Sequence, residues 1–140
     1  MSNSYPAKIS ALWTSFLFGM LFHTDLALMP LFHGLEVQHS HVGGNLHNVF
    51  GFMLIFFTLP MLAIIASNFT HAKSYRSFHF GLTIVYSFLN LGHLIADVMV
   101  GAPWYQIVLM VLLLLIGLLL NLVSFQWLKS KATRQSIAAH

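Results

Sequence analysis

Four long runs of apolar residues alternate with short polar segments along the chain. The runs predict helices over residues 9–29, 46–69, 77–100 and 104–128. An α-helix needs about 20 apolar residues to cross the hydrocarbon core of a bilayer, and each run has that length. The pattern therefore predicts an all-α integral membrane protein. We expect one antiparallel four-helix transmembrane bundle that takes up residues 1–140 as a single domain.

Proline and glycine mark the breaks in this pattern. Pro30 is expected to end the first helix, and Pro60 to kink the second, because proline removes a helical hydrogen bond and crowds the preceding turn. The Gly-Ala-Pro sequence at 101–103 closes the third run, and the longest connection is 30–45. Small residues let membrane helices approach closely, so we expect five glycines at helix contacts. These are Gly19, Gly51, Gly81, Gly92 and Gly117.

The composition agrees with a membrane location, and the charge pattern predicts the orientation of the chain in the membrane. The chain is 58% hydrophobic and 6% charged, where a soluble domain has about a quarter charged residues. All of its basic residues lie at one end of the runs: Lys8, Lys73, Arg76, Lys129, Lys131 and Arg134. Short basic segments stay in the cytoplasm, which predicts cytoplasmic N- and C-termini. So few basic residues fit topology better than nucleic-acid binding, which we do not expect.

The acidic residues and most histidines fall at the other end, facing the periplasm or a lumen. Helical rise places His23 about 22 Å and His93 about 25 Å from the cytoplasmic ends of their runs. Asp97 lies one turn beyond His93 on the same helix face, and His47 opens the second run. Two or three histidines with one carboxylate suit Zn, Fe(II) or Cu(II). The chain has no cysteine, which excludes thiolate and iron–sulfur sites. The sequence therefore predicts a transition-metal site at His23, His47, His93 and Asp97.

Other interpretations of these residues remain open. His93 and Asp97 can pair with each other or with Asn90 as a structural hydrogen-bond cluster, or serve a proton relay or a substrate. Asp25 is two residues from His23 and points to nearly the opposite side of the helix, so we rank it below Asp97 as a ligand.

The 30–45 connection is rich in histidine, and such segments often bind metals. Glu36, His39 and His41 are candidate loop ligands, although a solvated polar loop explains them equally well. Three methionines map to the same half of the bundle, where thioether sulfur favours Cu(I) or simply fills the core. They are Met29, Met53 and Met99.

A b-type haem is the main alternative cofactor, because two histidines on facing helices can ligate its iron. His23, His47 and His93 would be its candidate ligands. A second haem involving His79 is weaker, since His79 can form an interfacial pair with His71. A carboxylate beside His93 suits a bare cation better than a haem, whose propionates are negative.

These features predict a membrane protein that binds a transition metal, either a redox protein or a subunit of a redox assembly. The alternatives are a haem electron-transfer protein and a metal-handling or structural subunit of a larger membrane complex or homo-oligomer. Protease and hydrolase signatures such as His-Glu-x-x-His do not occur in the sequence. The fourth run has no ionisable side chain within its apolar stretch, and we expect much of it to face lipid.

Overall fold

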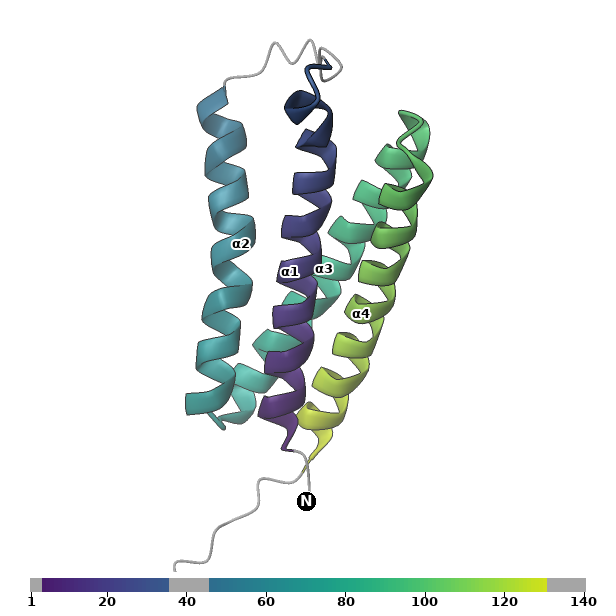
Figure 1. Ribbon diagram of the computed structural model, residues 1–140. Helices are drawn as coiled ribbons and strands as arrows, with labels where there is room; N and C mark the ends of the chain where they lie inside the picture. The colour runs from purple at the N-terminus through teal and green to yellow at the C-terminus, as the bar shows by residue number, and fades with distance from the viewer. Residues whose placement is uncertain (1–3, 36–45, 131–140) are drawn as a thin grey trace, which may run out of the picture.

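The computed structural model describes residues 4–35 and 46–130, which form four α-helices (Figure 1). They are α1 Tyr5–Phe32, α2 Leu46–Phe69, α3 Lys73–Met99 and α4 Trp104–Lys129. All four are long and apolar enough to cross a membrane. The all-helical fold and the four candidate spans predicted from the sequence are confirmed.

Two helices, α1 and α3, extend more than one residue beyond their predicted bounds. The expectation that α1 ends at Pro30 is wrong, because the helix continues through this proline to Phe32. Proline removes only one hydrogen bond, and so close to the helix end that loss does not stop the last turn. The helix α3 begins at Lys73, four residues before the predicted start, since the polar residues there still fit a helical turn at a membrane surface.

The end of α3 is held by a glycine in the left-handed region. Gly101 has φ +70°. The backbone N–H of Ala102 donates to the carbonyl of Asp97 at 2.9 Å, and that of Gly101 donates to Val98 at 3.2 Å. This is the Schellman motif, in which glycine avoids the penalty that a Cβ atom would bring. It fixes the last turn of α3, which carries Asp97.

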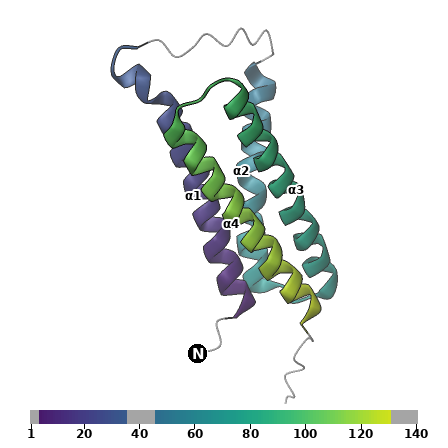
Figure 2. The same cartoon turned by 90° about the vertical axis from the view of Figure 1, so that its right-hand side faces the viewer.

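The helices stand side by side, with α1 packed between α2 and α4, and α4 packed between α1 and α3 (Figures 1 and 2). The start of α1, the end of α4 and the connection from α2 to α3 lie together at one end, which we call the Tyr5 end. The connection from α3 to α4 lies at the opposite end, which we call the Trp104 end.

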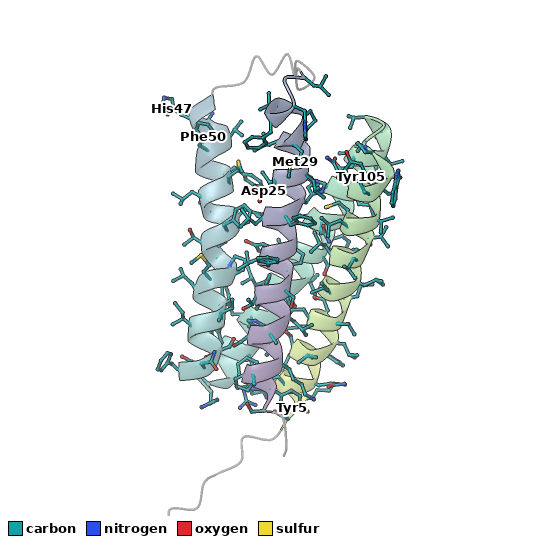
Figure 3. All side chains as sticks on the ribbon, viewed as in Figure 1. Tyr5, Asp25, Met29, His47, Phe50 and Tyr105 are labelled. Carbon is teal, nitrogen blue, oxygen red and sulfur yellow. The ribbon has the colours of Figure 1, made fainter. Side chains whose placement is uncertain are left out.

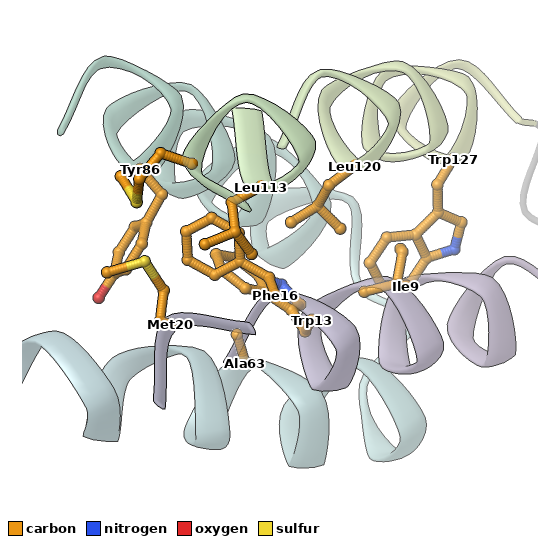
Figure 4. Packing of buried hydrophobic residues seen from close by; sticks show 10 residues of the cluster. Ile9, Trp13, Phe16, Met20, Ala63, Tyr86, Leu113, Leu120 and Trp127 are labelled. Atoms are coloured by element: carbon orange, nitrogen blue, oxygen red, sulfur yellow. The ribbon is translucent and has the colours of Figure 1, made fainter. Parts of the chain in front are cut away.

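Buried residues on three of the helices follow a spacing of alternating three and four positions. On α1 they are Ile9, Trp13, Phe16, Met20 and His23; on α3 they are Arg76, His79, Thr83, Tyr86 and Asn90; on α4 they are Gln106, Met110, Leu113, Gly117, Leu120, Ser124 and Trp127. This period of 3.5 residues is typical of left-handed helix packing, in which one stripe of each helix stays against its neighbours. The apolar members interlock along the bundle (Figure 4).

Much of the surface of α4 is exposed, as expected, but the helix also carries a buried stripe. Of the residues in its apolar window 28% are buried, against 11% for α2. Packing on both α1 and α3 buries a stripe of α4, and its uniformly leucine-rich sequence gives no sign of which side that stripe occupies. The helix α4 is therefore part of the core.

The helix α2 packs differently along its two halves. Its buried residues are Pro60, Ala63 and Ser67, which lie toward the Tyr5 end. None of residues 47–59 is buried. Tyr86 on α3 donates a hydrogen bond to the carbonyl of Phe56 at 2.7 Å, near the boundary between these halves. Toward the Trp104 end, α2 is only loosely packed.

Two of the five glycines lie at the expected close contacts. A Cβ atom built on Gly19 would stand 2.5 Å from Leu113 Cδ2, and one on Gly117 would stand 3.2 Å from Ser87 Oγ. Cβ atoms on Gly51, Gly81 and Gly92 would meet nothing within 4 Å. The glycine contacts therefore support the packing of α4 on α1 and α3, and the expectation for the other three glycines is wrong.

A histidine in the core near the Tyr5 end is held by tryptophan. Trp13 Nε1 donates to His79 Nε2 at 3.0 Å, and both side chains are fully buried. His71, the partner expected for His79, is exposed. This bond gives His79 a structural explanation that needs no second haem.

Candidate metal centre

Three polar side chains from α1 and α3 converge near the Trp104 end of the bundle. His23 Nε2 lies 3.4 Å from His93 Nε2 and 3.4 Å from Asp97 Oδ2. His93 Nε2 lies 3.7 Å from Asp97 Oδ1. The two imidazole rings meet nearly edge to face, with an angle of 79° between their planes. These residues form a group that could hold a metal ion.

Helix packing explains why they meet. His23 is the next member of the buried stripe of α1 after Met20. On α3 the buried stripe runs to Asn90, and the same spacing of three and four continues through His93 and Asp97. His23, His93 and Asp97 extend these stripes toward the Trp104 end, so the same periodicity that builds the apolar core also places these polar groups on the facing sides of α1 and α3.

The distances leave room for an ion. They exceed the length of about 2.7–3.2 Å usual for a hydrogen bond between nitrogen and oxygen, so the atoms converge without pairing tightly. Two nitrogen ligands about 2.1 Å from one ion stand roughly 3.0 Å apart in octahedral geometry and roughly 3.4 Å apart in tetrahedral geometry. The separation of 3.4 Å between His23 Nε2 and His93 Nε2 matches such an edge.

Burial differs among the three side chains. The side chain of His23 is 7% exposed, that of Asp97 is 15% exposed and that of His93 is 49% exposed. A carboxylate so far from solvent at membrane depth needs a cation beside it. A bound divalent ion provides that charge, as would a protonated imidazole of His23 or His93.

A buried amide beside the group has no hydrogen-bond partner in the described part of the chain. Buried polar atoms in native proteins nearly always have one. Within the described residues, neither Nδ2 nor Oδ1 of Asn90 has a partner. Nδ1 of His79, in the structural pair with Trp13, is also unpartnered among these residues, so such atoms alone do not distinguish a ligand site from a structural cluster.

A haem fits less well between these histidines. Axial nitrogens on opposite faces of a haem iron stand about 4 Å apart, with the porphyrin plane between them. His23 Nε2 and His93 Nε2 are closer than that, and the Asp97 carboxylate faces both of them. A porphyrin would have to displace this carboxylate, so the group favours a bare ion.

The other sequence-predicted ligands lie elsewhere. His47 is exposed at the start of α2 and is not part of the group (Figure 3). Asp25 is exposed on α1, as its position two residues from His23 indicated. Glu36, His39 and His41 lie outside the described residues. The structure therefore brings together side chains from α1 and α3. His47, the histidine expected from α2, is not part of this group.

A cavity of about 750 Å³ adjoins the group. It is bounded by all four helices, and His23, His93 and Asp97 are on its wall. The loosely packed half of α2 forms another wall, with Phe52, Met53, Phe56 and Phe57. Its volume falls within the range of roughly 300–1,000 Å³ that is usual for small-molecule sites. A ligand in this cavity could therefore reach an ion held by the three side chains.

Two polar residues of this cavity did not stand out in the sequence as ligand-binding candidates. Gln106 on α4 lines it and is buried. Asn90 also lines it, 2% exposed, although the sequence indicated it only as a partner for His93 or Asp97. The sequence did contain a sign of both residues, because an amide within an apolar span is unusual and usually faces the protein interior. Of the three methionines considered as sulfur ligands, Met53 lines the cavity, whereas Met29 and Met99 are exposed.

No protein-family model, curated protein or solved structure matches the chain. The chemistry that the site can support depends on its three candidate ligand groups. Two imidazoles and one carboxylate would supply three ligands to an ion and leave coordination positions for a further ligand. Such a centre can bind and polarise a small molecule, or exchange electrons if the ion is redox-active.

Proposed function

We propose that this chain is a multi-pass membrane protein that binds one transition-metal ion through His23, His93 and Asp97. The observation that carries the proposal is the convergence of two imidazole nitrogens and a carboxylate at 3.4–3.7 Å on the wall of a cavity. Two histidines and one carboxylate with open positions are the ligand set of many non-haem Fe(II) centres. Zn and Cu accept the same donors.

We further propose a redox role, as a redox protein or as a subunit of a redox assembly. Its support is the ligand set and the adjoining cavity, which gives a second molecule access to the ion. The charge pattern supports an antiparallel bundle with both termini in the cytoplasm. In that orientation the Trp104 end, with the metal centre, faces the periplasm or a lumen.

The first test is elemental analysis of the detergent-purified protein, together with optical spectra of its oxidised and reduced forms. We expect about one Fe per chain, or Cu or Zn in its place, and no Soret band. His23→Ala and His93→Ala each remove one of three ligands and should lower occupancy at least about tenfold. His71→Ala, at an exposed position near the Tyr5 end, is the matched control.

Three results would contradict this proposal in different ways. Equal metal contents in His93→Ala and His71→Ala would place the metal away from this group. A Soret band that disappears in the His23 and His93 variants would establish haem. A redox-inactive metal such as Zn in protein from metal-replete cells would retain the site and overturn the redox role.

A further inference from the structure

The cavity beside the metal centre is built for a particular kind of ligand. Its lining is mainly apolar, and it includes Phe52 and Met53, whose exposed fractions are 60% and 38%. These two residues line the cavity and are also exposed. The cavity therefore opens to the surface of the bundle beside α2, at the level of the predicted spans. A molecule dissolved in the bilayer could enter there without crossing water.

One buried amide faces this cavity with its hydrogen-bonding capacity unused. Asn90 is 2% exposed and lines the cavity, and within the described residues neither its Nδ2 nor its Oδ1 has a partner. Leaving a buried amide unpaired destabilises the protein, because the group has lost its hydrogen bonds to water without replacement. A ligand that offers both a hydrogen-bond donor and an acceptor would remove this penalty.

The lining of the cavity limits the head group of that ligand. A charged or strongly hydrated head group would lose its hydration in this mainly apolar lining without replacement. Asp97 lines the same cavity, but a divalent ion bound beside it would offset its charge, so repulsion by this carboxylate does not decide the choice. The unpaired amide of Asn90 favours a neutral head group with hydroxyl or carbonyl oxygen.

The aromatic wall indicates the shape of the head group. Phe56 stands 6.1 Å from Phe52 and 5.6 Å from Phe57, measured between ring centroids. Tyr86, which does not line the cavity, packs against Phe56 with 4.9 Å between ring centroids. Flat rings pack well against such a surface in offset or edge-to-face contact. A ring with oxygen substituents satisfies both this wall and the amide of Asn90.

We propose that the cavity binds a lipid-soluble quinone or quinol, with its ring against Phe52 and Phe56 and one ring oxygen at Asn90. The apolar tail then extends past α2 into the bilayer. This inference rests on the proposed function, since it supplies the molecule that meets the metal ion. Asn90 is three residues before His93, less than one helical turn, so a ring held by this amide lies close to the open side of the ion.

Photolabelling tests the proposal directly. The full-length protein, purified and placed in lipid nanodiscs free of quinone, is irradiated with an azido-benzoquinone that carries a decyl tail. Peptide mapping should find the label concentrated within 52–57 and 89–97. Asn90→Leu keeps the approximate size of the side chain but removes its hydrogen bonds, and it should reduce labelling about tenfold. Metal content is measured in the same samples and should be unchanged.

A second variant keeps the proposal testable if Asn90→Leu does not fold. Ala27 lines the cavity and is only partly buried, so Ala27→Phe should fill the space and reduce labelling without entering the core. Ala66→Phe is its matched control, because Ala66 lines a separate cavity of about 270 Å³ on the other half of α2. That control should label like the unmodified protein.

The outcomes separate this inference from the metal proposal. Label spread evenly over lipid-facing residues of all four helices, or unchanged labelling in both Asn90→Leu and Ala27→Phe, would overturn the quinone site. So would equal competition by decanoate, since an anionic head would then be accepted. Specific labelling of protein that contains no metal would support the cavity assignment and contradict the proposed metal centre.

Discussion

Asp97 determines whether the three converging side chains hold a cation. Its side chain is 15% exposed, and its neighbours are the imidazole nitrogens of His23 and His93. A carboxylate inside a membrane span is costly unless a positive charge lies beside it. The histidines supply ligand geometry, whereas Asp97 supplies the negative charge that retains the ion. The two contributions can be separated by substitution.

Asp97→Asn is expected to lower metal affinity at least about tenfold while leaving the fold in place. The amide has nearly the shape of the carboxylate and retains one oxygen, but the charge attraction to the ion is lost. Affinity is measured by competition with a chromophoric chelator in detergent. Asp25→Asn is the control, because Asp25 is an exposed carboxylate on α1 outside the group. Equal losses in the two variants would mean that overall charge, and not this site, governs binding.

The sequence predicted much of the candidate site at this scale. Counting helical rise placed His23 and His93 at similar depth, and the spacing of four placed Asp97 on the face of His93. Depth alone does not give the direction in which a side chain points. His47 has a suitable height but lies, exposed, at the start of α2. The residues that meet continue the three-and-four spacing of the buried stripes on α1 and α3, although the His93 side chain is 49% exposed, whereas no residue from 47 to 59 on α2 is buried.

Among the elements, α4 has a packing face that its sequence did not indicate. Its leucine-rich surface gave no preferred face, yet it supplies a buried stripe that contacts both α1 and α3. Hydrogen bonds between the helices accompany that packing. Asn121 Nδ2 on α4 donates to Ser87 Oγ on α3 at 2.9 Å. Arg76 Nη1 donates to the carbonyls of Trp127 and Ser130 at the end of α4, at 3.2 and 3.1 Å. A basic side chain on the last carbonyls of a helix also interacts well with its dipole.

The contact between α1 and α4 depends on the absence of a side chain at Gly19. Gly19→Val is expected to destabilise the protein by about 1–3 kcal/mol, because its methyl groups would meet Leu113, which is fully buried and has little room to move. Thermal unfolding in detergent, followed by the loss of helical circular dichroism, measures this change as a lower midpoint.

Gly51→Val is the matched control for this prediction. A Cβ atom at Gly51 would meet nothing within 4 Å, so the same added volume should shift the midpoint little. Similar shifts in the two variants would indicate that the effect comes from valine in a helix and not from the contact with Leu113. An unchanged midpoint in Gly19→Val would show that α1 and α4 can separate at no cost.

In the whole molecule, firm and loose packing are unevenly distributed. The stripes of α1, α3 and α4 interlock along the bundle, whereas α2 buries side chains only toward the Tyr5 end. The cavity follows from this difference, because the unburied half of α2 forms one of its walls. The sequence indicated four spans but not this cavity. Hydrophobic composition indicates that a segment lies in the membrane. The tightness of packing depends instead on how well side chains of neighbouring helices fit together.

The orientation of the bundle follows from its basic residues and can be tested with single cysteines, since the natural chain has none. Ala72→Cys and Pro103→Cys place thiols at exposed positions on opposite ends, in the connections that precede α3 and α4. We propose that Lys8, Lys73 and Lys129 retain the Tyr5 end in the cytoplasm, so a membrane-impermeant maleimide should label Pro103→Cys in intact cells and Ala72→Cys only after permeabilisation. The reverse pattern would put the metal centre on the cytoplasmic side. Labelling of both in intact cells would mean that the connections share a face, which is incompatible with α3 crossing the bilayer.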